Sequence, residues 1–273
     1  INGNNEISGF TLDGSNKTLI TGIFIRGTDE LNIHDIRFQN IKVNAIWVQG
    51  YYDWANKFTT PPPAYGQNVI IHDIISNNTS SHTDYGWGEG LGAISLGALE
   101  NAHVYNLALN ENYVGGGRGI KAVGGWLKRF KGHNWNIKTD TTNDQAFVFE
   151  MYNFLDDSEI YDCTFNNSLS LNSGPQTLVT GSSWNLKIHD TKTDFSGFVT
   201  AALGHELSHN HLDYYNNYIY GNKGRGAGLW TTNYLTATSV NNWRFRNNVV
   251  NNCAAGGLTI ERGALSKIEI FNN

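Results

Sequence analysis

Two histidines flank a glutamate in residues 205–209, which read His-Glu-Leu-Ser-His. Zinc peptidases use this pattern on a helix, where residues four apart lie one above the other and can share a metal ion. The flanking sequence is rich in aromatic, β-branched, Asn and Gly residues, which favour strands and turns over helix. The sequence therefore predicts that His205 ends a strand and that Glu206 starts a turn. A metal site of another geometry, built from His205, Glu206, His209 and His211, stays open.

The composition is typical of a β-protein. The chain has 273 residues with 30 glycines, 4 prolines and one methionine, and no amphipathic helical segment of useful length. No linker or charge block divides the chain, so we expect one domain over residues 1–273, either complete or a fragment without its end caps. The net charge of −5 indicates no nucleic-acid partner, and no apolar run approaches the roughly 20 residues that cross a bilayer. Two cysteines make neither a disulfide framework nor a zinc cluster.

A repeat organises the whole chain. Each short apolar strand is followed by a turn and by a second strand that carries Asn or Asp at a matching position. Asn and Asp suit such a position because they tolerate left-handed backbone. Successive members are about 25 to 38 residues apart, which predicts the stacked coils of a parallel β-helix with an Asn/Asp ladder. The column contains Asp35, Asp73, Asn106, Asn134, Asp162, Asp190, Asn216, Asn247 and Asn272.

With these repeats the chain resembles the right-handed parallel β-helix superfamily that includes pectate lyases, polygalacturonases and phage tailspike enzymes. The resemblance is architectural and covers nearly all of the chain. The paired-Asp and Arg-Lys signatures of particular members are absent, and the pair Asp156–Asp157 falls in a turn. The resemblance implies an all-β, single-stranded right-handed solenoid of about nine coils that acts on carbohydrate. We expect it to be secreted, in an extracellular or periplasmic location, because the chain opens as a mature or trimmed fragment would.

Alternation along the first strand of each coil separates core residues from an outward face. On this face we predict a saccharide groove, because most of the long insertions, at 51–67, 79–92, 111–118, 139–145 and 168–176, adjoin it. Aromatic rings with polar rims suit sugar rings, although they could also simply cover the sheet. The predicted substrate-binding residues are Arg26, Trp47, Gln49, Trp87, Tyr113, Trp230 and Arg262.

A second outward column, beside the Asn/Asp positions, carries flat rings. We predict that these rings stack on one another and are structural. We also predict that Cys163, in the inward column, is a buried packing residue. The ring column contains His34, His72, Tyr105, His133, Tyr161, His189 and Tyr215.

Hydrolysis of a glycosidic bond needs two carboxylates, one of them protonated. Glu150 projects from the outward face, and Lys121 one coil away would keep it ionised as the base. Glu206, beside His205, would be the acid. Two coils span about 9.6 Å, which suits an inverting glycoside hydrolase without a cofactor. Substitute carboxylates on the loops are Asp84, Glu89, Glu111 and Asp144.

Two other classes stay open. A polysaccharide lyase would use Lys121, Arg118, His205 or a loop Tyr as base against a uronic-acid polymer, with Ca²⁺ held by Glu150 and Asp144. A non-catalytic glycan-binding, tailspike or adhesin-type β-helix would only bind saccharide. In every case the expected partner is a polysaccharide or oligosaccharide, with no nucleic acid and no membrane, and the protein would be a monomer or a trimer.

Overall fold

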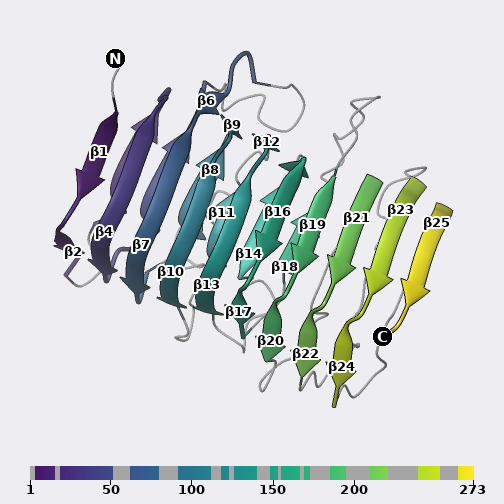
Figure 1. Cartoon of the computed structure of the whole chain (residues 1–273). Helices are drawn as coiled ribbons and strands as arrows, with labels where there is room; N and C mark the ends of the chain where they lie inside the picture. Colours follow the sequence, from purple (N-terminus) through teal and green to yellow (C-terminus); the bar gives the residue numbers. More distant parts are fainter. Residues whose placement is uncertain are drawn as a thin grey trace.

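The computed structural model is an all-β chain. It describes residues 4–15, 19–51, 62–79, 92–111, 118–122, 126–139, 148–152, 155–166, 169–172, 185–194, 210–220, 239–252 and 264–273, and these contain no helix. The pairings between their strands are parallel and form three sheets (Figure 1).

Sheet A is the largest of the three and runs the length of the molecule, from β1 near the N-terminus to β25 near the C-terminus (Figure 1). Its main strands are β1 (Asn5–Ser8), β4 (Leu31–Gln39), β7 (Val69–Asn77), β10 (His103–Glu111), β13 (Lys131–Thr139), β16 (Ser158–Tyr161), β19 (Leu186–His189), β21 (Asn210–Tyr215), β23 (Ser239–Arg246) and β25 (Ala264–Phe271). The shorter strands that extend its far edge are β2 (Thr11–Asp13), β17 (Thr164–Phe165), β20 (Lys192–Asp194), β22 (Tyr218–Tyr220) and β24 (Val249–Asn251).

Sheets B and C are shorter. Sheet B contains β3 (Thr21–Arg26), β5 (Asn44–Gln49), β8 (Gly92–Gly97), β11 (Arg118–Ala122), β14 (Phe149–Tyr152) and β18 (Leu169–Asn172). Sheet C contains β6 (Gly66–Gln67), β9 (Leu99–Glu100), β12 (Leu127–Lys128) and β15 (Leu155–Asp156). Successive strands go to sheets B, C and A in turn, as in β8, β9 and β10, so each turn of the chain adds a parallel layer to a solenoid.

A column of left-handed residues crosses the middle of sheet A. The nine Asn and Asp positions aligned from the sequence all have φ between 51° and 55°. Such values are strained for most side chains, but Asn and Asp accept them. Side-chain hydrogen bonds join three members, since Asn134 Nδ2 donates to Asn106 Oδ1 at 2.6 Å and Asn106 Nδ2 donates to Asp73 Oδ1 at 3.1 Å.

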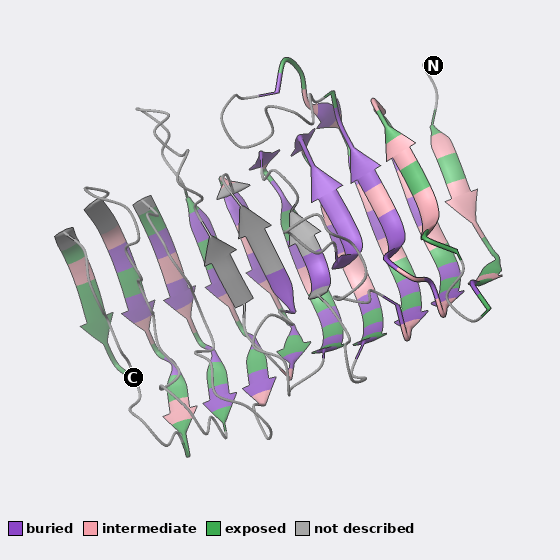
Figure 2. Ribbon diagram, turned by 180° about the vertical axis from the view of Figure 1, so that it is seen from behind, coloured by how far each residue is buried: buried purple, intermediate pink, exposed green. Residues whose placement is uncertain are grey.

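The core lies between the sheets and is filled by the inward side chains. In β4 and β7 buried residues alternate with more exposed ones, as expected for a sheet with one face in solvent. In β5 and β8 almost every residue is buried, so these strands of sheet B are covered on both faces (Figure 2). The two sheets therefore differ in how much of their outer face reaches solvent.

A buried asparagine ladder follows the left-handed column by one residue. At this inward position the early coils carry apolar residues, including Trp135 and Cys163, and Cys163 is buried as predicted. The later coils carry Thr191, Asn217 and Asn248, which are buried, and Asn273, which is exposed. Asn248 Oδ1 accepts the backbone N–H of Asn217 at 3.0 Å, and Asn273 Oδ1 accepts that of Asn248 at 2.9 Å. Each amide thus caps a backbone donor of the coil before it.

Replacement of Asn248 by Ala should destabilise the solenoid. The change leaves the N–H of Asn217 and the carbonyl of Tyr214, which now accepts from Asn248 Nδ2 at 3.1 Å, without partners in the core. We expect the free energy of unfolding to fall by about 2–4 kcal/mol. Urea unfolding measures this loss, and Asn136→Ala, an exposed residue of β13, should stay within about 0.5 kcal/mol of the parent. Equal effects of the two substitutions would contradict a structural ladder.

Candidate functional site

The register of sheet B brings together three residues predicted from the sequence. Trp47 of β5 pairs with Ser95 of β8, Ser95 pairs with Lys121 of β11, and Lys121 pairs with Glu150 of β14. Phe24 extends the row at one end. An aromatic residue, a cationic residue and a carboxylic residue therefore share one row across four neighbouring strands.

The position of Glu150 corrects the sequence alignment of this coil. Alternation along the first strands, taken from the sequence alone, aligns Val148 with Lys121, two residues before Glu150. The structure instead pairs Phe149 with Ile120, and the ring of Phe149 packs 6.0 Å from Trp135 and 6.3 Å from Phe130. This aromatic cluster selects the register, and Glu150 becomes the direct neighbour of Lys121.

A second row contains two more predicted binding residues, Arg26 and Gln49, which are register partners. Arg26 is exposed, whereas Gln49 is only 3% exposed. The Nε2 group of Gln49 is buried and makes no hydrogen bond with the described part of the chain. A buried amide donor without a protein acceptor is rare and calls for an explanation.

The outer face of sheet B is less open than the predicted groove. Ser95 is fully buried and Trp47 is partly buried, although both occupy outward positions by register. Phe24, on the neighbouring strand β3, is 55% exposed, and its ring lies 4.9 Å from that of Trp47. Access to the row is thus restricted at β5 and β8 and open at β3.

Several predicted site residues fall outside the described residues. They are Trp87, Tyr113, Asp144, His205, Glu206, Trp230 and Arg262. For Arg118, Lys121 and Glu150 the structure gives the backbone position and register, with Arg118 opposite Gly92 at the start of β11.

Glu111 was a substitute for the catalytic carboxylate, and that prediction is wrong. Glu111 ends β10 with 0% exposure, and its Oε1 accepts a hydrogen bond from Ser76 Oγ at 2.7 Å. Its other oxygen accepts the backbone N–H of Thr79. The sequence suggested a loop position, but the side chain is buried and accepts hydrogen bonds from residues at the end of β7 and just after it.

The described side chains include no group of three or more His, Cys, Asp or Glu that could hold a metal ion. Of the four residues considered for a metal site near 205–211, His211 is the described one. Its Nε2 lies within hydrogen-bonding distance of Asn242, 2.9 Å from Nδ2 of that amide.

The outer face of sheet A carries the predicted stack of rings, which the structure confirms. From His34 through Tyr215, successive ring centroids are 4.5–5.2 Å apart and nearly parallel. Arg246 continues the stack, with its Cζ 4.0 Å from the centre of the Tyr215 ring. The ring faces cover one another, so they offer no flat platform to a sugar.

Two kinds of histidine environment occur in and beside this stack. Hydrogen bonding to Asp35 at 2.7 Å raises the pKa of His34. His103 and His133 face each other with 2.9 Å between their Nε2 atoms. Burial lowers the pKa of both, and for His103 repulsion from His133 adds to the effect. The surroundings of His34 thus stabilise its protonated form, and those of His103 and His133 stabilise the neutral form.

These directions predict opposite effects of acid on stability. Between about pH 8 and pH 5 the unfolded chain protonates His103 before the folded chain does, so this residue costs stability on acidification. The folded chain protonates His34 first, so His34 adds stability as the pH falls and loses this contribution as the pH rises through its raised pKa. His103→Gln should therefore reduce the loss of unfolding free energy between the two pH values, and His34→Gln should increase it. Denaturant titrations at both pH values test this, and identical losses in all three proteins would refute it.

No protein-family model matches the chain, and no curated protein matches it. A solved structure described as "Crystal structure of Agl-KA catalytic domain" aligns with a TM-score of 0.56 and 11% identity over 98% of this chain and 52% of that chain. This chain therefore spans about half the length of the matched chain. At this identity the match shows the fold, which this chain shares with a catalytic domain. None of the described residues forms a helix long and apolar enough to span a membrane.

Proposed function

We propose that the protein degrades a polysaccharide by cleaving glycosidic bonds at the outer face of sheet B. The observation that carries the proposal is the row that contains Trp47, Lys121 and Glu150. The fold shared with a catalytic domain supports an enzyme. The solenoid itself would be a right-handed parallel β-helix of about nine coils. The nine left-handed Asn and Asp positions, one in each coil of sheet A, support this number.

The row supplies a base for hydrolysis. Lys121 and Glu150 are register partners on neighbouring parallel strands, which lie about 4.8 Å apart, so the cation of Lys121 would favour the ionised form of Glu150. The ionised carboxylate would activate water, and Glu206 would protonate the leaving oxygen as the acid of an inverting pair. This division of roles needs no cofactor.

Gln49 and Trp47 would hold the sugar. An apolar ring face packs against the C–H face of a sugar, and Trp47 has this character. The buried Nε2 of Gln49 would gain its missing acceptor from a substrate hydroxyl. A recessed donor of this kind contributes to specificity, since a substrate without that hydroxyl leaves the donor unpaired.

The same row also favours a second candidate, β-elimination on a uronic-acid polymer. Elimination needs a base and cations close to the substrate carboxylate, and Lys121 and Arg118 lie on one strand beside Glu150. In this reaction Glu150 and Asp144 would hold Ca²⁺, which prefers clustered oxygen ligands. The two reactions differ in product, because elimination leaves an unsaturated sugar that absorbs ultraviolet light.

Substitution within the row should abolish turnover. Glu150→Gln removes the base and Lys121→Gln removes its cation, so we expect kcat to fall by about 10²- to 10⁴-fold in the first variant. Lys192→Gln, an exposed lysine on β20 of sheet A, is the matched control and should retain full activity. The assay follows new reducing ends and ultraviolet absorbance together on neutral and acidic polysaccharides, with and without EDTA.

Each result of that assay has a distinct meaning. New reducing ends without absorbance support hydrolysis, whereas absorbance that EDTA abolishes supports elimination with bound Ca²⁺. Full activity of Glu150→Gln contradicts both roles of Glu150. Saccharide that binds and is never shortened would leave a non-catalytic glycan-binding solenoid.

A further inference from the structure

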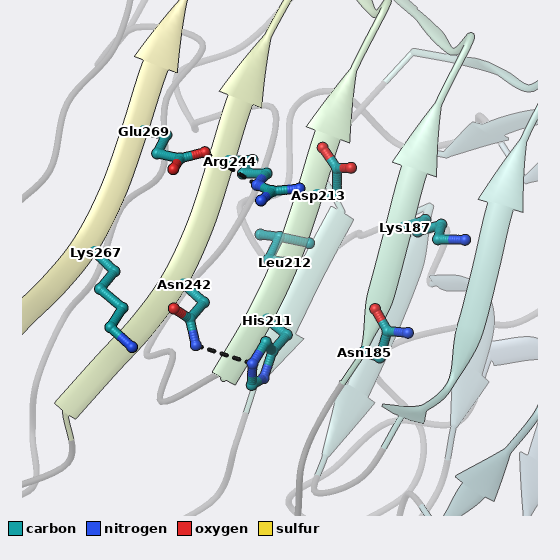
Figure 3. Close-up of a pocket in the computed structure, with 9 residues that line it drawn as sticks. All are labelled: Asn185, Lys187, His211, Leu212, Asp213, Asn242, Arg244, Lys267 and Glu269. Atoms are coloured by element: carbon teal, nitrogen blue, oxygen red, sulfur yellow. Dashed lines mark hydrogen bonds and ion pairs between the residues drawn. The ribbon is translucent and has the colours of Figure 1, made fainter.

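A groove lies on the outer face of sheet A, near its C-terminal end. It encloses about 430 Å³ and runs across β19, β21, β23 and β25 (Figure 3). One wall comes from Asn185, just before β19, and from His211, Asn242 and Lys267 on β21, β23 and β25. The other wall comes from the next outward position on each strand, namely Lys187, Asp213, Arg244 and Glu269.

Both carboxylates of the groove are already neutralised by arginines. Asp213 is held by Arg246 through two hydrogen bonds of 2.9 and 3.1 Å, and Glu269 accepts a hydrogen bond of 3.0 Å from Nε of Arg244. Each carboxylate of the groove therefore already accepts hydrogen bonds from an arginine of the protein itself. The groove is in this way lined by fixed, paired charges.

The two lysines of the groove carry charges that remain available. Within the described part of the chain, neither Lys187 nor Lys267 forms an ion pair, and both are exposed. Figure 3 shows them at opposite sides of the group, with His211 and Asn242 between them. Strands β19 and β25 are three strand spacings apart, which separates the two lysine backbones by about 14 Å along the solenoid.

Between the lysines the groove offers groups that bind hydroxyls. The amides of Asn185 and Asn242, together with Asp213 (paired with Arg246) and Arg244 (paired with Glu269), provide donors and acceptors along its length. Arg246, stacked on Tyr215, fixes the orientation of Asp213. These fixed polar groups suit a chain of sugar rings better than a small ion.

We propose that this groove binds an acidic oligosaccharide whose carboxylates reach Lys187 and Lys267 at its two ends. The lining residues carry three cations and two anions, which leaves one positive charge on a protein whose net charge is −5. Local cations on an acidic protein attract a ligand with spaced negative groups. This binding site lies on sheet A and does not require catalysis on sheet B, so binding and turnover can fail separately.

Calorimetric titration with the hexamer of galacturonic acid tests the proposal, with a neutral maltohexaose and inorganic phosphate as the other two ligands. The full chain should bind the acidic hexamer and neither of the others at the same concentrations. The double variant Lys187→Gln and Lys267→Gln should weaken binding by about tenfold or more, because two charge-assisted contacts are lost. Both lysines are exposed, so the variant should keep the parent fold and its unfolding midpoint.

The matched control removes two lysines elsewhere on sheet A. Lys138→Gln with Lys192→Gln changes the net charge by the same amount at exposed positions of β13 and β20, and it should bind the acidic hexamer within about twofold of the parent. An equal loss in both double variants would reduce the effect to overall charge and overturn the site. Equal binding of maltohexaose would overturn the acidic specificity, and equal binding of phosphate would reduce the groove to a simple anion site. Absence of binding by the acidic hexamer would overturn the proposal.

Discussion

The whole arrangement depends on the left-handed residue in the middle of each coil of sheet A. A left-handed conformation costs an ordinary L-residue about 1–2 kcal/mol, so its repetition at nine positions requires side chains that tolerate it. It lets each strand change direction without losing its parallel hydrogen bonds to the coils on either side. Because the change occurs at the same place in every coil, residues on either side of it line up in columns along the solenoid.

These columns explain features that no single coil possesses. The stack from His34 to Tyr215 forms because one flat ring precedes the left-handed residue in each of these successive coils, and Arg246 takes the same position in the next coil. Two residues before the ring column, later coils carry a column in which positive and negative side chains alternate. Each carboxylate of this column therefore has a cationic register partner on at least one neighbouring strand. Its members are Lys131, Glu159, Lys187, Asp213, Arg244 and Glu269. The groove on sheet A is the end of this column.

Much of the fold could be predicted from the sequence, and the exceptions have physical reasons. The Asn/Asp spacing predicted the left-handed column and the ring stack beside it. The sequence predicts turns where the two-residue strands of sheet C lie, because two residues show no alternation. The register of β14 was misaligned by two residues, and a period of two cannot detect such a shift. The buried ladder did have a sequence signal: the repeated Asn-Asn pairs at 216–217, 247–248 and 272–273, in which the second Asn faces inward.

The candidate site was harder to predict, because it depends on register and burial. The sequence identified Lys121 and Glu150 but not that they are direct neighbours, since the packing of Phe149 decides their alignment. It also could not predict that Gln49 and Ser95 are buried at outward positions. The lysines of the groove are exposed residues on separate coils, and each alone is an ordinary solvated charge. Only stacking of the coils places them at two ends of one surface.

Catalysis on sheet B is tested most directly by a crystal structure of the Glu150→Gln protein with an oligosaccharide of its substrate bound. We expect sugar rings across the outer face of sheet B, with one ring against Trp47, a hydroxyl on Gln49 Nε2 and a glycosidic bond between Lys121 and residue 150. Saccharide bound only in the sheet A groove, with none along the row on sheet B, would contradict this expectation.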